Sequence, residues 1–409
     1  SHPKTRQVQA VTYNYEKPSI VCLQDCSDSV RQDLDYLRQT FSGATFDVLS
    51  RTMDDTIWVV YVQSDKGLSY CQGSPSGYFI FQRGQSLTLV ATPQPELAKY
   101  GLVLATMTPV HIPARDGENL LCYLSTPPSF VQHGKSPLVL FIHGGPQARD
   151  IWQFHPFCQL LCNRGMCVLQ VNYRGSTGMG SRFVKIGMNG VFATQLQEDI
   201  QDAAQYAIKQ KWCSPDRIAI MGASFGGYCS LAAMTFMADE TDRNPHYQCA
   251  VAICPPSIFG AANPHKAFYG NPLIAKYWKQ VFGPAISNSV QASEAISPMF
   301  HMEKIQKPVL ILHGEDDPRA PIEQSDQAFQ KLKVESSSEY VRFGKEGHGI
   351  RKEQNLLYMA HCIERFLCRH LGLPEPPRLE EFRLQGHTAT PVTLQQGECL
   401  SSEKKDKDA

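Results

Sequence analysis

Apolar and polar positions follow two different patterns along the chain. Between residues 1 and 105, short runs such as TIWVVYVQ and GYFIFQR are rich in β-branched and aromatic residues, and turn-forming stretches such as SDKG and GSPSG separate them. Such runs are typical of strands, because branched and aromatic side chains pack well on a pleated surface. The pattern predicts that residues 1–105 form an all-β region.

From residue 106 the pattern changes to short apolar runs that alternate with amphipathic segments. The apolar runs include PLVLFIHGG, MCVLQVNYRG, RIAIMGAS and PVLILHG, and QLQEDIQDAAQYAIKQ lies between the second and the third. In that segment Leu196, Ile200 and Ala204 fall on one face of a helix. Strands that alternate with helices form a mostly parallel sheet covered on both sides. We therefore predict an α/β domain over residues 106–372.

The last portion of the chain, residues 373–409, has a different character. It opens with PEPP and ends with SSEKKDKDA, so it is rich in charge and poor in apolar residues. Such a composition cannot bury enough apolar surface to form a core. We expect this portion to be a flexible tail.

Charge and composition argue against several kinds of partner. The 409 residues carry 39 basic and 39 acidic side chains, and no long basic stretch offers the attraction that nucleic acids and anionic membranes require. No apolar run reaches the roughly 18 residues that span a bilayer. The first residues lack the apolar core of a signal peptide, and the chain begins with Ser1 rather than methionine, which is consistent with a fragment or a processed form.

The 14 cysteines lie mostly inside apolar runs such as FCQLLCNRGMCVLQV and HCIERFLC. Free cysteine packs as a small buried hydrophobe, and disulfides are rare in reducing compartments, so this placement predicts reduced thiols and a cytoplasmic location. No pair has the C-x-x-C spacing of a zinc site. We expect neither a metal nor another cofactor.

One stretch, IAIMGASFGGYCS, carries the strongest chemical signal. Ser224 stands between Gly222 and Gly226 directly after an apolar run, which matches the G-x-S-x-G turn that lifts a nucleophilic serine above the end of a strand. Glycines are needed there because side chains would crowd the strand or the following helix. The turn predicts Ser224 as a nucleophile.

A nucleophilic serine needs a base and a carboxylate, which in this kind of domain follow it in the order acid, then histidine. Asp317 in HGEDDPRAP and His348 in GKEGHGI each follow a predicted strand in that order. The adjacent Asp316 and Glu315 are alternative carboxylates. His143 and His313 also stand at strand ends, and we assign them structural roles.

The negative charge that develops on the substrate oxygen requires two donors. One comes from the residue after the nucleophile and the other from an early strand-to-helix loop. The N–H groups of Phe225 and of Gly145, which lies in HGGP, fit these two positions. Asn172 and Arg174 in NYRGS are expected to support neighbouring loops, and Tyr173 and Tyr228 to pack.

Together, GASFGGY, HGGP, NYRGSTGMG, HGEDDPRAPIEQS and EGHGI resemble the catalytic domain of the prolyl oligopeptidase family of serine peptidases, and most of all its acylaminoacyl-peptidase and dipeptidyl-peptidase branch. The resemblance covers about residues 106–372 and implies the α/β-hydrolase fold. The family pattern HGxxDxxVP selects Asp317, with Ala320 in place of the usual valine.

The resemblance also implies an N-terminal β-propeller. Residues 1–105 suffice for about two four-stranded blades, whereas closed propellers have about 4 to 8. Either this region is part of a longer propeller, or it packs otherwise, for example against a second copy in a homo-oligomer.

The leading functional hypothesis is a serine peptidase that acts on short peptides and releases N-terminal acylated or free amino acids or dipeptides. The aromatic segment CPPSIFGAANPHKAFYGNPLIAKYWKQVFGPA forms either an apolar first subsite or a surface helix packed on the core. The alternatives are an esterase of small acyl esters, which would use the same triad, and an inactive scaffold.

Overall fold

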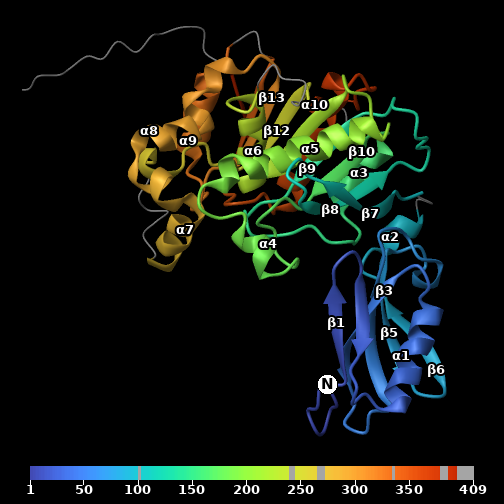
Figure 1. The fold of residues 1–409 in the computed structure, drawn as a ribbon. Helices are drawn as coiled ribbons and strands as arrows, with labels where there is room; N and C mark the ends of the chain where they lie inside the picture. Colours follow the sequence, from blue (N-terminus) through green and yellow to red (C-terminus); the bar gives the residue numbers. More distant parts are fainter. Residues whose placement is uncertain (100–102, 239–244, 265–271, 334–336, 378–385, 394–409) are drawn as a thin grey trace, which may run out of the picture.

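The computed structural model describes residues 1–99, 103–238, 245–264, 272–333, 337–377 and 386–393. A large mixed sheet dominates it (Figure 1). Its strand order is β15-β14-β13-β12-β11-β9-β10-β8-β7. The strands are β7 (Thr106–Pro113), β8 (Asn119–Thr126), β9 (Leu138–Ile142), β10 (Cys167–Val171), β11 (Ile218–Ala223), β12 (Cys249–Ile253), β13 (Val309–Gly314), β14 (Glu339–Phe343) and β15 (Ala389–Val392).

The centre of this sheet is parallel and its edges are antiparallel. Strands β9 to β14 pair in parallel, whereas β8 pairs antiparallel with β10, β7 with β8, and β15 with β14. The parallel strands are almost continuously apolar because both faces are covered. The sheet fits the predicted mostly parallel arrangement, and it places the carboxyl ends of the central strands at one edge.

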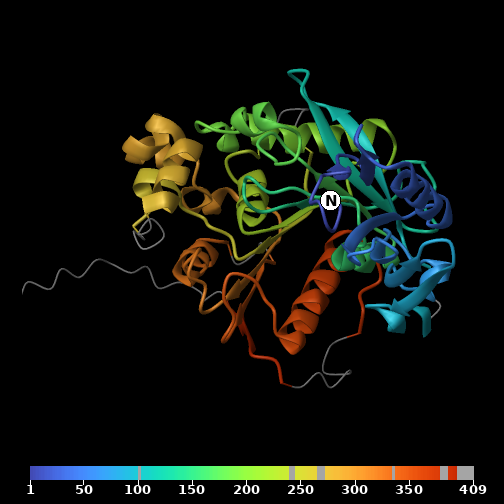
Figure 2. The ribbon, with the colours of Figure 1, turned by 90° about the horizontal axis from the view of Figure 1, so that it is seen from below.

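Helices cover both faces of the sheet. Helices α3 (Pro156–Asn163) and α10 (Glu353–His370) pack on one face, and α5 (Gln195–Lys209), α6 (Phe225–Met234) and α9 (Ile322–Gln330) on the other. Figure 2 shows α10 on the side of the sheet opposite to α5 and α6. Alternate residues of one strand divide between the faces, since Leu140 faces one cluster and Val139 the other. Three further helices lie outside these layers: α4 (Ser181–Lys185), α7 (Pro272–Asn288) and α8 (Val290–Ala295).

The N-terminal region forms a smaller unit with its own core (blue in Figure 1). A four-stranded antiparallel sheet has the order β3-β4-β5-β6, and β1 pairs with β2 in a separate hairpin. Its elements are β1 (Ala10–Asn14), β2 (Pro18–Cys22), α1 (Asp28–Thr40), β3 (Thr45–Arg51), β4 (Ile57–Gln63), β5 (Ser76–Gln82), β6 (Ser86–Ala91) and α2 (Pro95–Lys99).

The expectation of an all-β N-terminal region was wrong, because α1 spans 13 residues of it. Val30, Leu34 and Leu37 lie at helical spacing and pack into the core of this unit. The side chain of Ser27 caps the first turn by accepting a hydrogen bond from Val30 N–H. The propeller is not confirmed: the described residues of this region form one four-stranded sheet, a hairpin, two α-helices and a short 3₁₀ helix (Ser69–Cys71).

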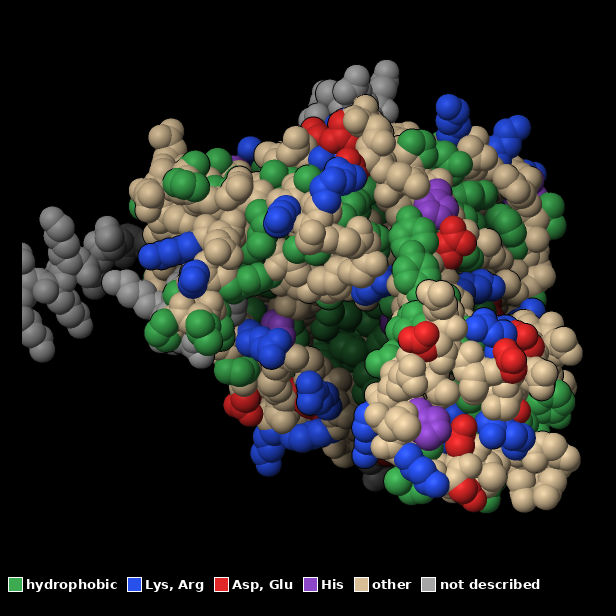
Figure 3. Space-filling model, turned by 60° about the horizontal axis from the view of Figure 1, so that its bottom comes forward, with side chains coloured by type: hydrophobic (Ala, Val, Ile, Leu, Met, Phe, Trp, Pro, Cys, Tyr) green, Lys and Arg blue, Asp and Glu red, His purple; other side chains and the backbone are tan. Residues whose placement is uncertain are grey.

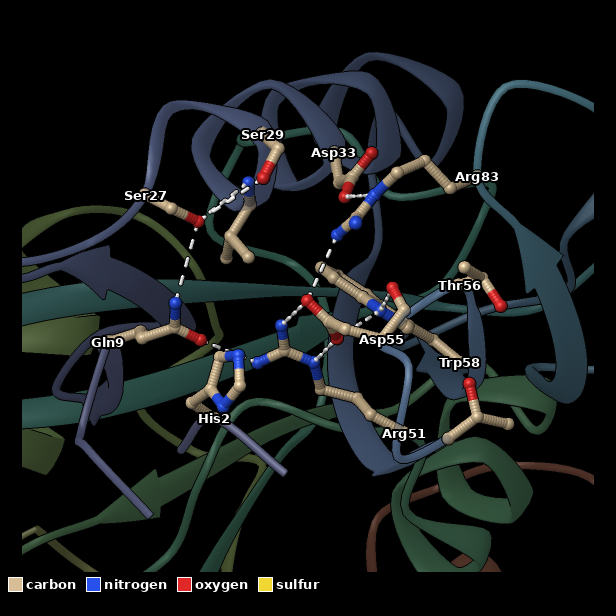
Figure 4. A network of polar contacts seen from close by, with 12 residues as sticks. His2, Gln9, Ser27, Ser29, Asp33, Arg51, Asp55, Thr56, Trp58 and Arg83 are labelled. Atoms are coloured by element: carbon tan, nitrogen blue, oxygen red, sulfur yellow. Dashed lines mark hydrogen bonds and ion pairs between the residues drawn. The ribbon is translucent and has the colours of Figure 1, made fainter. Parts of the chain in front are cut away.

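Charged side chains are paired inside this unit (Figure 4). Asp55 binds Arg51 through both carboxylate oxygens and also accepts a hydrogen bond from Arg83, which in turn binds Asp33. The indole N–H of Trp58 donates to Asp55 over 3.1 Å. Because each carboxylate has an arginine partner, the network stabilises the charges near the core.

The tip of the β1–β2 hairpin contacts the larger unit. Arg149 donates hydrogen bonds of 2.9 Å to the backbone oxygens of Asn14 and Tyr15, and the ammonium of Lys17 lies 4.3 Å from the ring centre of Trp152. The face seen in Figure 3 is hollowed between the two units, with hydrophobic side chains at the floor of the hollow.

The segment expected to be a flexible tail contains an ordered part. Residues 389–392 form β15, which pairs with β14 from Ala389 opposite Phe343 to Val392 opposite Tyr340. The short stretch ATPV supplies backbone donors and acceptors to an exposed sheet edge, a role that composition does not reveal. Residues 378–385 and 394–409 lie outside the described part of the chain.

Candidate active site

Ser224 lies in a sharp turn between β11 and α6. Its backbone has φ 56° and ψ −119°, a conformation that is strained for a residue with a side chain. The turn is possible because a Cβ atom on Gly226 would lie 2.0 Å from the oxygen of Ile142, and one on Gly222 would lie 2.5 Å from Gly226. The glycines of the motif are therefore required by close backbone contact.

The structure brings His348 and Asp317 to this serine. His348 Nε2 lies 2.7 Å from Ser224 Oγ, and His348 Nδ1 lies 2.7 Å from Asp317 Oδ2. Since the carboxylate accepts a hydrogen bond from Nδ1–H and keeps the proton on Nδ1, Nε2 is free to accept the serine proton. The three residues predicted from chain order form one hydrogen-bonded line.

The Asp317 carboxylate is held from several directions. Its Oδ1 accepts hydrogen bonds from Arg319 N–H and Ala320 N–H over 2.8 and 3.0 Å, and His313 Nε2 lies 3.2 Å from its Oδ2. Burial by itself raises the pKa of Asp317, but the hydrogen bonds from His313, His348 and Ala320 outweigh it and hold this pKa well below its usual value. The carboxylate is ionised at neutral pH.

The neighbouring carboxylates do not take this place. Asp316 and Glu315 are exposed, whereas Asp317 is buried. The backbone N–H of Asp316 instead donates to the carbonyl oxygen of Glu346.

The two residues predicted to bind the oxyanion lie beside the serine. Gly145 and Phe225 line the same pocket as Ser224 and His348. A Cβ atom on the adjacent Gly144 would lie 3.4 Å from Ser224 Cβ, so the glycine loop passes close to the nucleophile. Phe225 is the first residue of α6, where backbone N–H groups point away from the helix and carry partial positive charge.

A pocket of about 370 Å³ opens next to the serine. Its lining is mainly apolar and includes side chains from the aromatic segment identified in the sequence, in agreement with the subsite interpretation. Part of the same segment forms α7, which packs on the core, so the helix interpretation holds as well. Residues 265–271 of the segment lie outside the described residues. Sequence reasoning missed Arg319, although HGEDDPRAP contains it. The lining residues are Gly145, Ser224, Phe225, Pro256, Phe259, Ile274, Tyr277, Trp278, Pro318, Arg319, Ala320 and His348.

The other two strand-end histidines have structural partners. His143 Nε2 lies 2.9 Å from Ser176 Oγ, and its ring stacks on Tyr173. Burial lowers the pKa of His143 to about 4. His313 Nδ1 lies 2.7 Å from Ser325 Oγ, and its Nε2 lies 2.8 Å from the Ala320 oxygen. Neither histidine bonds to Ser224.

The NYRGS segment has the supporting role that was expected. Arg174 donates to both carboxylate oxygens of the fully buried Asp199 and also binds Asp116. Asn172 Oδ1 accepts a hydrogen bond from Asp150 N–H, and Asn172 Nδ2 donates one to the backbone oxygen of Asp150. Tyr228 is buried and donates to Ile296 O.

Cys254, His313 and Asp317 form the single group in the described ranges whose ligand atoms could meet on a metal ion, within 4.8 Å of one another. Burial raises the pKa of the Cys254 thiol to about 12. The Asp317 carboxylate already accepts a hydrogen bond from His348. We assign the group to the support of the carboxylate. The cysteines of the described residues form no disulfide, and all but Cys22 and Cys362 are buried.

Comparison with known proteins identifies the family. The model of the prolyl oligopeptidase family matches residues 152–374, which is more than half of the chain. The chain belongs to the prolyl oligopeptidase family. Relatives include dipeptidyl aminopeptidase BIII of Pseudoxanthomonas mexicana, 33% identical over 388 residues, which are 93% of this chain and 53% of that protein. Dipeptidyl peptidase family member 6 of Caenorhabditis elegans is 32% identical over 91% of this chain and 51% of its own length.

The chain thus spans about half the length of these two family members. An acylamino-acid-releasing enzyme of Rattus norvegicus is 29% identical over 54% of this chain and 29% of that enzyme. These relatives match the branch that the sequence motifs resemble.

Solved structures of family members share the fold. An acylaminoacyl peptidase of Pyrococcus horikoshii superposes with a TM-score of 0.66 at 17% identity, covering 91% of this chain and 56% of that one. A puromycin-hydrolyzing peptidase of Mycobacterium tuberculosis superposes with a TM-score of 0.64 at 24% identity, covering 78% of this chain and 46% of that one. The larger unit therefore has the α/β-hydrolase fold. Within the described ranges, no helix has the length and apolar character needed to span a membrane.

Proposed function

We propose that this chain carries the catalytic machinery of a serine peptidase that hydrolyses short peptides at a position near their amino terminus. The observation that carries the proposal is the unbroken line from Ser224 Oγ through His348 to Asp317, with both hydrogen bonds at 2.7 Å. The names of the relatives, dipeptidyl aminopeptidase and acylamino-acid-releasing enzyme, support release of free or acylated N-terminal units.

The mechanism is acyl transfer to water. Ser224 Oγ attacks the carbonyl carbon of the scissile bond while His348 Nε2 takes the serine proton, and the N–H groups of Gly145 and Phe225 bind the oxygen that becomes negative. The C–N bond then breaks as His348 returns the proton to the leaving amine. Water, activated by the same imidazole, hydrolyses the acyl-enzyme and regenerates Ser224. Asp317 holds the imidazole in the required tautomer throughout.

The pocket indicates the side chain that binds nearest to the scissile bond. Phe259, Tyr277 and Trp278 supply aromatic walls, and Ile274 an aliphatic one. Such a lining favours a large apolar residue at the cleavage point, because burial of apolar surface contributes about 25 cal/mol per Å².

The proposal is tested by labelling with a fluorophosphonate probe, with wild-type protein beside Ser224→Ala and His348→Ala. We expect labelling in the wild type and none in either variant. Turnover of acyl-amino-acid and dipeptide chromogenic amides then defines the substrate class. Absence of labelling in correctly folded wild-type protein would contradict the proposal and favour an inactive scaffold.

The same atoms would also hydrolyse small acyl esters, so amides and esters of the same acyl group are compared directly. A peptidase gives amide turnover that disappears with Ser224→Ala. Turnover of esters alone would favour the esterase alternative.

A further inference from the structure

Glu346 lies two residues before His348 and is buried, with 4% of its surface exposed. Its carboxylate accepts hydrogen bonds from the backbone N–H groups of Arg351 and Lys352 over 3.1 and 3.0 Å, and from Asn355 Nδ2 over 2.7 Å. Burial raises the pKa of Glu346, but these donors outweigh it and hold this pKa below its usual value. An ionised side chain therefore ties the histidine loop to the start of α10.

Asn355 extends this connection to the C-terminal strand. Besides Glu346, Asn355 Nδ2 lies 3.0 Å from Thr388 Oγ1, and Asn355 Oδ1 accepts from Thr388 N–H over 2.8 Å. Thr388 in turn accepts from Gly344 N–H with its backbone oxygen and donates from its hydroxyl to Gly344 O. Thr388 directly precedes β15. It is thus bonded to both ends of the connection between β14 and α10, and His348 lies in that connection.

Glu346 also contacts the loop of the catalytic carboxylate. Its backbone oxygen accepts a hydrogen bond from Asp316 N–H over 2.8 Å. A Cβ atom on Gly314, the last residue of β13, would lie 2.5 Å from the same oxygen. One residue therefore fixes the spacing between the loops that carry Asp317 and His348.

From these contacts we propose that Glu346, Asn355 and Thr388 are positioning residues for His348. In this arrangement the segment that begins β15 helps to position His348, although it lies at the sheet edge and in the segment expected to be a tail. The inference rests on the proposed function of the triad. Its physical reason is that a misplacement of about 1 Å at a reacting group costs roughly 100-fold in rate, and Gly347 and Gly349 beside His348 give the loop little rigidity of its own.

The test uses the full chain and pairs the variants of Thr388 and Glu346 with control variants at exposed residues nearby in the sequence. Thr388→Val removes one hydroxyl, Thr388→Ser retains it, and the exposed Thr390 on β15 provides Thr390→Val as control. Glu346→Gln removes the charge, and the exposed Glu353 in the first turn of α10 provides Glu353→Gln. Folding is checked by thermal unfolding, and all kinetics are measured well below the unfolding transition.

We expect kcat to fall about tenfold or more in Glu346→Gln and Thr388→Val, with KM within about twofold, because the imidazole is displaced while the substrate pocket is untouched. Thr388→Ser and both controls should stay near wild type. Combining Thr388→Val with Asn355→Ala should cost less than the product of the single effects, since both act through one contact. Unchanged kcat in folded Glu346→Gln and Thr388→Val would overturn the inference, even if both unfold at lower temperature.

A second readout does not depend on turnover. The His348 Nδ1 proton that is bonded to Asp317 should give a downfield proton resonance, assigned by its loss in His348→Ala. We expect this resonance to shift or broaden in Glu346→Gln and to remain in Glu353→Gln. If wild-type protein turns over no substrate, the proposed function fails, and this resonance still decides the inference: an unaltered signal in Glu346→Gln overturns it.

Discussion

His313 Nε2 donates a hydrogen bond to the backbone oxygen of Ala320 over 2.8 Å and lies 3.2 Å from Asp317 Oδ2, so a second, fully buried imidazole supports the loop of the carboxylate that holds His348. His313 Nδ1 is in turn fixed by Ser325 Oγ at 2.7 Å. The hydrogen bond from His313 is the first of those that lower the pKa of Asp317 against the effect of burial. The triad thus depends on a residue that the motif pattern alone assigns only a structural role.

This relationship predicts a graded effect of substitutions at His313. His313→Gln keeps an N–H donor near the position of Nε2 and should lower kcat only a fewfold. His313→Leu removes the donor and should lower kcat by about 100-fold, since the orientation of Asp317 and His348 is lost. Steady-state kinetics on the two folded variants check this. Equal activity of the Leu and Gln variants would contradict it.

Asp317 and Asp316 provide a matched pair for assigning the catalytic carboxylate. Asp317→Asn should lower kcat by about 10⁴, because the amide favours the wrong imidazole tautomer. Asp316→Asn should change kcat less than about twofold, since only the backbone of Asp316 makes a contact in this network. The measurement is kcat for one amide substrate. A larger loss of kcat in Asp316→Asn than in Asp317→Asn would identify Asp316 as the catalytic carboxylate.

The apolar pocket predicts a change in specificity at Ile274, whose side chain lines it and is 42% exposed. Ile274→Asp should raise KM for substrates with a large apolar residue at the cleavage point by about tenfold and leave kcat nearly unchanged, because it removes uniform binding. Val290→Asp on α8, which is outside the pocket lining and 53% exposed, is the control. A similar KM for both variants would place the subsite elsewhere.

Asp150 predicts a pH dependence of stability. Burial raises the pKa of Asp150 to about 7 despite a hydrogen bond from Gln170 and the nearby charge of Arg149. Its Oδ2 and the Oε1 of Gln170 are buried without a hydrogen-bond partner among the described residues. The unfolded carboxyl ionises near pH 4, at about 3.9, so ionisation stabilises the unfolded state before the folded state as the pH rises. The stability contribution of the protonated group is complete below about pH 4 and is lost as the pH rises through 7.

Asp150→Asn is expected to remove this dependence, because the amide carries no charge and can donate to Gln170 Oε1. Relative to wild type, the variant should gain little stability near pH 4 and about 4 kcal/mol above pH 7, because a pKa difference of about three units is worth that much. Denaturant unfolding at several pH values measures the difference. The exposed Asp25 provides Asp25→Asn as control, and a gain that does not depend on pH would refute the explanation.

The sequence by itself determined the chemistry and the class of fold. Ser224, Asp317 and His348 could be predicted because each belongs to a short local pattern at the end of an apolar run, and the chain order of the three is characteristic. The parallel sheet followed from apolar strands that alternate with amphipathic helices. These signals are local: a turn or a strand of this kind needs the same few residues wherever it lies in the chain.

Only the tertiary structure decided the features that depend on distant partners. Helix α1 was missed because strand-rich neighbours outweighed its three spaced apolar residues, Val30, Leu34 and Leu37. Strand β15 has no pattern of its own and becomes a strand through the free edge of β14. The link from Thr388 to Asn355 joins two segments that are far apart in the sequence and that meet only through packing. Hydrogen bonds of this kind leave no periodic trace in a sequence, because they depend on where the backbone places two residues in space.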